Sequence, residues 1–514
     1  MTDDLMRFSH LITICLCILT MATCRFAIGD DATAVRKKIL DRPEFAHSID
    51  GRGIVDYAQA VNTHLGAGIL PEDNVAALLY QAIGPRPRNR VLSPRLFERL
   101  GISQPNANGR YFTAFPDFQS TDIEVDGEPP ERPWMSNEYT RTDAWLEANR
   151  YALEIVDQAV QRPQYFLPLD PQLDLDGHET GIPLSQLHGC QQSREIATAL
   201  IARGMKNFYS RSPRECWDQL FACHMLGRHL SHGTTFIGQL VGYAIEDRAV
   251  AAELVWLSKS HCTTADIDCA ESDLQHLQPL GSISRSINVC ERAAFLEAIQ
   301  MLRNERLRAY NENVNDGGWS RAQLFFWTNA CRGNIESVEM AKMVNFWVDR
   351  MVEAQRLKTY PERKRAITKL QEKLRQISSK LVNANMGDFW SDDAQVRRAN
   401  VSGFLALHII HAFSGAMMGG FEVESRTVQR AINLRLALAL KKHLIVKGGY
   451  PGTLEELVPE FIEAVPRDEF SGKCLIYKPT KDAYTLYSVG DNLIDDGGKS
   501  YDESKDDIVV MFPK

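Results

Sequence analysis

The chain has 514 residues, of which 44% are hydrophobic and 24% are charged, a composition typical of soluble globular proteins. Its length predicts about three domains and allows a core large enough to be stable without a metal or a disulfide. The formal net charge of -8 argues against nonspecific nucleic-acid binding, which requires a basic surface. We therefore expect no nucleic-acid partner.

An uncharged apolar run lies near the N-terminus, from Leu11 to Ala22. It is shorter than the roughly 20 residues that a helix needs to cross a bilayer, but it has the length of a signal-peptide core. The small residues Ala27 to Gly29 follow at the spacing of a cleavage site. Residues 1–29 are therefore predicted to be a signal peptide or an N-terminal anchor. This prediction places the chain in the periplasm or cell envelope.

Two other interpretations of the N-terminus stay open, because the residues before the apolar run carry almost no net positive charge. One is an uncleaved segment that gives the chain a membrane contact and anchors it in the inner membrane. The other is an apolar first helix of a cytosolic protein.

Residues 30–184 are predicted to mix helices with proline-rich loops. Apolar residues recur at helical spacing in Val55–Leu65, in Asn74–Ile83 and from Ser136 to Val160. Proline removes a backbone donor and blocks helix continuation, so loops are expected where prolines gather. These prolines are Pro85, Pro87, Pro94, Pro105, Pro116, Pro129, Pro130 and Pro133.

Residues 185–425 are predicted to form a helical body. Ser212 and Pro213 have the pattern of a helix cap followed by a first-turn proline. Antiparallel helices joined by short turns form hairpins, which pack as a bundle or as an irregular solenoid. The predicted helices are Ser193–Met205, Arg214–Leu230, Thr234–Leu257, Ser320–Trp347 and Arg363–Val382.

The stretch Arg363–Val382 is the most regular amphipathic helix of the chain. Its apolar residues are Ile367, Leu370, Leu374, Ile377 and Leu381, spaced three and four apart. The positions between them are basic: Lys364, Arg365, Lys369, Lys373, Arg375 and Lys380. The basic side has two interpretations, a solvated helix face and a contact with an anionic surface.

No charged residue occurs from Val401 to Phe421, a length that could span a membrane. The stretch also contains histidines, serines and glycines, which lower its transfer free energy, so we expect a buried core helix. Gly415 and Gly419 have the spacing of a helix-contact motif.

The last segment, residues 426–514, is predicted to be a separate α+β module. Thr427–Val446 is an amphipathic helix, and three strand-like runs follow, Cys474–Lys478, Tyr484–Val489 and Ile508–Phe512. The chain as a whole is therefore expected to be mainly α, with one helix packed on a three-stranded antiparallel sheet at its C-terminal end.

An acidic loop lies between the second and third of these strands. It runs from Gly490 to Gly498, and it is followed by Asp506 and Asp507. Crowded carboxylates repel one another, and a divalent cation removes that cost. Calcium takes six to eight oxygen ligands in a pliable loop, and Asp, Asn and Gly supply such oxygens and turns. A solvated acidic turn is the competing interpretation.

The same module resembles the globular domain of the major pseudopilin of type II secretion. The matching motifs, in the same order, are Gly449-Tyr450-Pro451, Leu454-Glu455-Glu456-Leu457-Val458, Val465-Pro466-Arg467-Asp468, Ser488-Val489-Gly490-Asp491 and Asp495-Asp496-Gly497-Gly498. In that family the acidic loop binds calcium. The resemblance therefore implies that five aspartates are candidate calcium ligands: Asp491, Asp495, Asp496, Asp506 and Asp507.

This sequence departs from that family in its N-terminal part. A pseudopilin begins with its long hydrophobic helix, whereas hundreds of residues precede the module here, and no prepilin-peptidase site is visible. The resemblance implies the fold and the metal, not assembly into a filament. The whole chain also resembles exported bacterial proteins that have a helical body and this tail.

A second candidate site is the cluster of His224, His229 and His232 in the helical body. Histidines three apart share a helix face and can bind zinc. No His-Glu-x-x-His, nucleophile elbow or phosphate-binding loop accompanies them, so packing and capping are the favoured roles. We therefore predict no catalytic residues and expect a non-catalytic scaffold or interaction protein with protein partners in the cell envelope. The alternative is a metal-dependent enzyme with its site in the helical body.

Overall fold

The computed structural model describes residues 55–89, 91–119, 127–171, 181–182, 187–208, 212–259, 261–303, 336–382, 392–499 and 506–512. These residues are mainly helical, and they end in a small three-stranded antiparallel sheet. The predicted fold class is therefore confirmed. The N-terminal apolar run, and with it the expected signal peptide or anchor, lies outside the described residues.

The N-terminal region holds α3 (Tyr57–Leu65), α4 (Val75–Ile83), α5 (Pro94–Arg99), α6 (Thr140–Ala148) and α7 (Arg150–Ala159). Two expectations were wrong here. The proline-rich stretch contains a helix, α5, because Pro94 lies in its first turn and Ser93 caps it. The helix expected from Ser136 to Val160 is two helices, because the side chain of Asn149 between them bonds to both the N–H and the carbonyl of Thr113.

The helical body begins with α8 (Leu187–Asn207), α9 (Pro213–Leu230), α10 (Phe236–Lys259), α11 (Thr264–His276) and α12 (Ile283–Ser286). It continues with α13 (Arg292–Arg303), α16 (Ser337–Gln355) and α17 (Tyr360–Val382). The predicted cap of α9 is present as a reciprocal capping box between Ser212 and Glu215. Helices α9 and α10 cross at very short distance, since a Cβ atom on Gly242 would lie 2.2 Å from the backbone nitrogen of Ser231.

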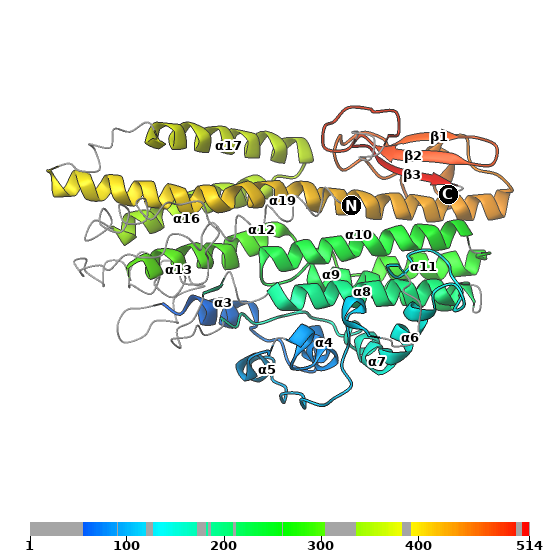
Figure 1. Cartoon of the computed structure of the whole chain (residues 1–514). Helices are drawn as coiled ribbons and strands as arrows, with labels where there is room; N and C mark the ends of the chain where they lie inside the picture. The colour runs from blue at the N-terminus through cyan, green and yellow to red at the C-terminus, as the bar shows by residue number, and fades with distance from the viewer. Residues whose placement is uncertain are drawn as a thin grey trace.

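The longest element is α19 (Ala394–Lys447), which runs along the whole molecule (Figure 1). The sequence predicted two helices here, and that prediction was wrong. The helix continues through Gly420. This glycine packs closely against Ile283 and Phe236, and a Cβ atom there would lie 2.5 Å from Ile283. Beyond it, Glu424 accepts a hydrogen bond from the backbone of Ile283 at 3.1 Å, and Arg426 pairs with Asp491. These contacts stabilise the helical conformation of the polar residues that follow Phe421, including Glu424 and Arg426.

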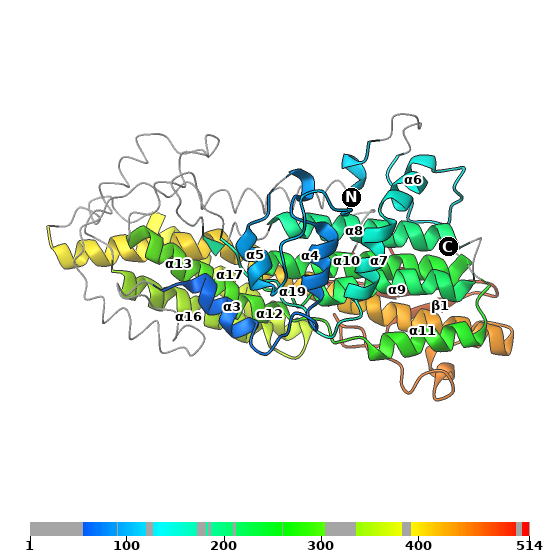
Figure 2. The ribbon, with the colours of Figure 1, turned by 90° about the horizontal axis from the view of Figure 1, so that it is seen from below.

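Two hydrophobic cores lie along α19. Its first half, including Val401, Ile410 and Phe421, packs with α3, α12, α13, α16 and α17. Its second half, including Leu434 and Leu440, packs with α8 to α11 and the sheet. Figure 2 shows α13 and α16 beside the first half and α11 beside the second. In Figure 1, the N-terminal helices α4 to α7 lie on the side of α8, α9 and α10 that faces away from α19.

The sheet consists of β1 (Ile476–Pro479), β2 (Tyr484–Ser488) and β3 (Ile508–Phe512), in the order β1-β2-β3. Leu486 is directly opposite Val510 in the β2–β3 register, and both side chains are buried. Tyr484 and Phe512, also paired, stack with ring centroids 5.2 Å apart. Alternate residues therefore face α19, as the period of two in the sequence predicted.

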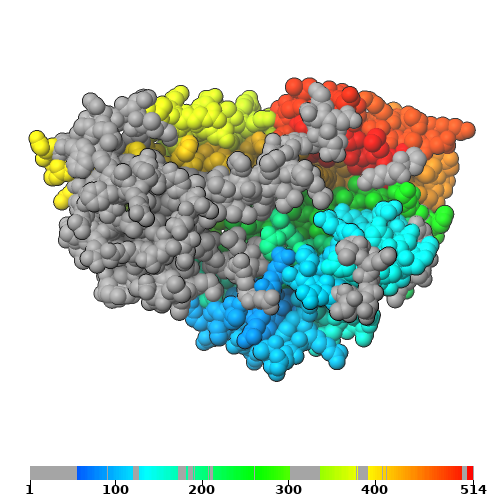
Figure 3. All heavy atoms as spheres, viewed as in Figure 1, coloured from blue at the N-terminus to red at the C-terminus, as the bar shows by residue number. Residues whose placement is uncertain are grey.

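The expected boundary between residues 425 and 426 falls inside α19, so one continuous helix belongs to both the helical body and the C-terminal module. The core of the module is continuous with that of α8 to α11. In the space-filling view the module and α17 occupy one edge of the molecule (Figure 3). Among the described helices, α19 alone is long and apolar enough to cross a bilayer, and 67% of its most apolar window is buried in the fold.

Candidate metal site

The acidic loop begins where β2 ends at Ser488 and folds back against the start of β3. Gly490 has a φ of +64°, and a Cβ atom there would lie 2.3 Å from the carbonyl oxygen of Asp506. Only glycine fits such a turn against the neighbouring backbone. Gly497 and Gly498 also have positive φ values, 80° and 83°. The glycines of the motif thus bring the loop against Asp506 and Asp507.

Three carboxylates of the loop converge. One oxygen each from Asp496, Asp506 and Asp507 lies within 4.8 Å of the others, and this is the one such group among the described residues. The backbone N–H of Asn492 donates to Oδ2 of Asp506, and that of Gly498 donates to Oδ2 of Asp507, both at 2.8 Å. Each remaining Oδ1 atom is buried, and no donor among the described residues reaches it. The two side chains are only 8% and 3% exposed.

A buried carboxylate with one oxygen that lacks a donor is costly as an anion. Burial raises the pKa of Asp506 to about 7, and a hydrogen bond with Asp491 adds to the shift. Burial also raises the pKa of Asp507, to which the nearby Asp496 and Asp495 contribute. A divalent cation between these groups would offset the desolvation and the mutual repulsion.

The other two aspartates predicted as ligands are engaged elsewhere. Oδ1 of Asp491 pairs with Arg426 at 2.7 Å, and its carbonyl accepts from Lys364 of α17. Burial acts to raise the pKa of Asp491, but the hydrogen bond from Asp506 and the charge of Arg426 outweigh burial and lower it. Oδ1 of Asp495 accepts from the Tyr487 hydroxyl at 3.1 Å and from the Gly497 N–H at 2.9 Å. The structure thus brings three of the five candidate ligands together.

The oxygen-only donor set of Asp496, Asp506 and Asp507 fits a hard cation such as calcium. Zinc and copper favour nitrogen and sulfur ligands, which this group does not contain. Three carboxylates can supply three to six of the six to eight oxygens that calcium takes, and backbone carbonyls and water would complete the shell.

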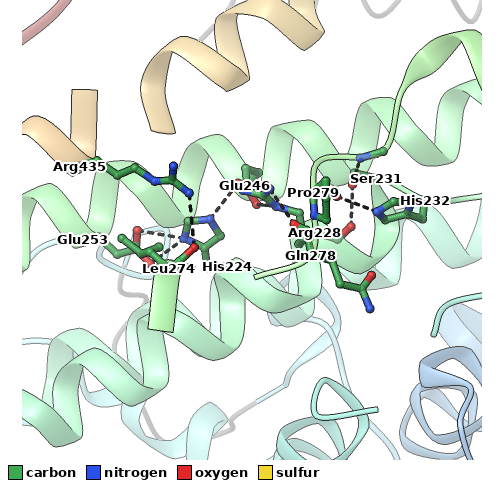
Figure 4. Close-up of polar contacts among 11 residues, drawn as sticks. His224, Arg228, Ser231, His232, Glu246, Glu253, Leu274, Gln278, Pro279 and Arg435 are labelled. Atoms are coloured by element: carbon green, nitrogen blue, oxygen red, sulfur yellow. Dashed lines mark hydrogen bonds and ion pairs between the residues drawn. The ribbon is translucent and has the colours of Figure 1, made fainter. Parts of the chain in front are cut away.

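The three histidines of the second candidate site have separate partners. His224 of α9 lies between two glutamates of α10, with Nε2 2.8 Å from Glu246 and Nδ1 2.9 Å from Glu253 (Figure 4). Arg228, one turn further along α9, also pairs with Glu246. The side chains of Glu246, Glu253 and Arg228 are all largely or fully buried. Both imidazole nitrogens thus contact carboxylates of α10.

The cluster combines two cations with two anions. Burial acts to lower the pKa of His224, but Glu246 and Glu253 outweigh it and raise the pKa to about 10. The two glutamates shift in opposite directions, although burial acts to raise both. The pKa of Glu246 is lowered because His224 and Arg228 together outweigh burial. The pKa of Glu253 is raised because burial, with the nearby charge of Glu246, outweighs the contact with His224. The group is a buried ion network that links α9 to α10.

His229 and His232 point to other partners. Nε2 of His229 lies 2.9 Å from the carbonyl oxygen of Val160, and Nε2 of His232 lies 2.8 Å from that of Pro279. The three histidines therefore do not converge, which supports the packing and capping roles expected from the sequence. The sequence interpretation missed Glu246 and Glu253. Two glutamates seven residues apart, on one face of a mostly apolar helix, were the signal that could have revealed them.

Comparison with known protein families, with characterised proteins and with solved structures finds no match to this chain.

Proposed function

We propose that this chain is a non-catalytic scaffold or interaction protein of the cell envelope, and that its C-terminal α+β module is stabilised by a divalent cation, best matched by calcium. The cation would be held by Asp496, Asp506 and Asp507. Its role is structural: it joins the loop after β2 to the beginning of β3.

The observation that carries the proposal is the pair of buried Oδ1 atoms on Asp506 and Asp507, with no donor among the described residues and an oxygen of Asp496 within 4.8 Å. Buried polar atoms of this kind are usually paired with a protein group, an ordered water or an ion. A solvated acidic turn, the competing interpretation, would expose these side chains to water. Their exposures of 8% and 3% disfavour that interpretation.

Two observations support the non-catalytic role. The histidines that could have formed a catalytic or zinc site have separate partners, a carboxylate pair and two backbone carbonyls. The carboxylate group of the loop contains no histidine, cysteine or hydroxyl nucleophile among its three members. Nothing in this donor set supplies a general base poised beside a nucleophile.

The resemblance of the C-terminal module to the major pseudopilin is part of this proposal. That family begins with a long hydrophobic helix, and α19 has an apolar first half followed by an amphipathic half that carries the sheet. Here α12, α13, α16 and α17 cover the apolar half. The envelope location rests on the apolar run of residues 11–22, and fractionation of a tagged chain tests it. Recovery in the cytosol would contradict it.

Thermal unfolding of the full chain tests the cation. We expect the melting temperature to be higher in calcium than in chelator, because a ligand that binds only the folded state stabilises it by mass action. Magnesium should raise it less, since it demands a tighter octahedral shell and loses water reluctantly. Isothermal titration with calcium should report one site per chain.

The matched variants are Asp507→Asn and Asp482→Asn. Asp482 is an exposed aspartate in the turn between β1 and β2, so its variant removes one negative charge without touching the group. Asp507→Asn should abolish the calcium response, and Asp482→Asn should keep it. An equal melting temperature in calcium and chelator for the parent chain would refute the cation proposal.

A further inference from the structure

The exposed side of α17 forms a basic surface beside α16, on a chain whose formal net charge is -8. Helix α17 contains seven basic and two acidic residues. It packs on the rest of the molecule through Tyr360, Ile367 and Leu374, which are buried. That packing turns Arg365, Lys369, Lys373 and Arg375 to solvent.

These four cations form no salt bridge with a carboxylate of the described residues. Arg365, Lys369 and Lys373 lie four residues apart, so they form one line along the helix. Arg356 and Lys358, in the turn that leads into α17, are also exposed and extend the basic surface at its N-terminal end. Acidic residues also lie nearby: Arg350 pairs with Glu353, and Glu362 lies beside Arg365 and Lys358. Basic residues nevertheless outnumber acidic ones along α17, seven to two.

An exposed aromatic ring lies within this surface. Phe346 of α16 is 45% exposed. The ammonium group of Lys373 lies 5.7 Å from its ring centroid, and the guanidinium carbon of Arg350 lies 5.4 Å from it. Cations beside an exposed aromatic ring are characteristic of surfaces that rest on lipid headgroups, where the ring enters the interface and the charges meet phosphate.

We propose that this surface, defined by Arg356, Lys358, Arg365, Lys369, Lys373 and Arg375 around Phe346, binds an anionic phospholipid membrane. Each cation near an anionic bilayer adds to the attraction, and the attraction falls away within a Debye length. Helix α17 lies along the same edge of the molecule as the C-terminal module, on the upper side of Figure 1. The proposal does not depend on the cation in the acidic loop.

Vesicle flotation of the full chain tests the membrane contact. Two vesicle types are compared, pure phosphatidylcholine and an equal mixture of phosphatidylcholine with phosphatidylglycerol, both in chelator. The apolar N-terminal run would bind both types alike, so the readout is the extra binding to the anionic vesicles. We expect that increment to be on the order of tenfold and to disappear in about 1 M salt.

The decisive variant is the triple charge reversal Lys369→Glu, Lys373→Glu and Arg375→Glu. Its matched control is Arg110→Glu, Lys473→Glu and Lys481→Glu, which changes the net charge equally at exposed positions outside α16 and α17. The first triple should lose the anionic increment, and the control should keep it. Circular dichroism confirms that both remain folded.

Three outcomes would overturn the proposal. One is equal binding of the parent chain to both vesicle types, and another is an equal loss of the increment in both triple variants. The third comes from a parallel titration with single-stranded RNA: binding to RNA that depends on Lys369, Lys373 and Arg375, without any preference for anionic vesicles, would assign the surface to another polyanion.

Discussion

Nε2 of His224 lies 2.8 Å from a carboxylate oxygen of Glu246, inside the contact between α9 and α10 where neither side chain reaches solvent. A buried pair of this kind is weak evidence for net stability, because desolvation offsets most of the attraction. Its members nevertheless depend on one another, since the loss of one leaves an uncompensated charge. We therefore expect that replacing one member of this ion pair lowers the stability of the fold.

The variant His224→Gln should lower the free energy of unfolding by about 3–5 kcal/mol, because it leaves Glu246 and Glu253 buried without their shared cation. Urea denaturation measures the change. His232→Gln is the matched control, since His232 is only partly buried and has one backbone partner, Pro279. The control should lose about 1 kcal/mol or less. Equal losses in the two variants would show that the ion network has no special role.

Glu291 predicts a pH dependence of stability. Burial raises its pKa from 4.5 to about 7, and its one hydrogen bond among the described residues comes from the backbone of Phe236 at 2.9 Å. The folded state therefore holds the proton more tightly than the unfolded state. The contribution to stability is fully present below the unfolded pKa of 4.5 and is lost as pH rises through about 7.

The variant Glu291→Gln keeps the acceptor oxygen and removes the titration. Between about pH 5 and about pH 8, its stability relative to the parent chain should rise by roughly 3 kcal/mol. Denaturant unfolding at the two pH values measures this difference. Glu98→Gln, at an exposed position, should show no such change. A constant gap between Glu291→Gln and the parent would contradict the prediction.

Asp491 and Asp507 should respond differently to substitution, although both were predicted as ligands. Asp491→Asn removes an ion pair with Arg426 in which both side chains are partly exposed, so it should cost about 1 kcal/mol or less and leave the calcium response intact. Asp507→Asn should remove that response. Melting curves in calcium and in chelator compare them. Loss of the response in Asp491→Asn would show that Asp491 turns from Arg426 to the cation.

Two helical glycines give opposite predictions. Gly242→Ala would place a Cβ atom 2.2 Å from the backbone of Ser231, so it must push α9 and α10 apart and should cost about 1–3 kcal/mol or more. A Cβ atom on Gly415 would meet no described atom within 4 Å, so Gly415→Ala should stabilise α19 by about 0.5–1 kcal/mol. Chemical denaturation measures both. Destabilisation by Gly415→Ala would show that another segment packs against the expected contact motif at Gly415 and Gly419.

Much of the local structure could be predicted from the sequence. The helix over Val75–Ile83, the cap at Ser212 and the three strands lie within about two residues of their predicted positions, because side-chain period, capping residues and turn residues act over short distances. The mainly helical class with a C-terminal sheet followed from the same signals. The candidate site was predicted to lie in the correct loop, since its glycines and aspartates are neighbours in sequence.

Which aspartates converge was a matter of tertiary structure. Asp496 lies near Asp506 and Asp507 because β2 and β3 pair. Asp491 instead binds Arg426 and Lys364, which are distant in sequence. The contact of His224 with Glu246 and Glu253 depends on the crossing of α9 and α10 in the same way.

The sequence by itself determined the mainly helical class and the positions of several elements, such as Val75–Ile83 and the three strands, because those depend on interactions between near neighbours. Only the tertiary structure decided that α19 continues through Gly420 and which charged groups meet. Those outcomes depend on the packing of Gly420 against Phe236 and Ile283 and on ion pairs between distant segments. The free energy of such contacts cannot be predicted from a pattern of residues that are near neighbours in sequence.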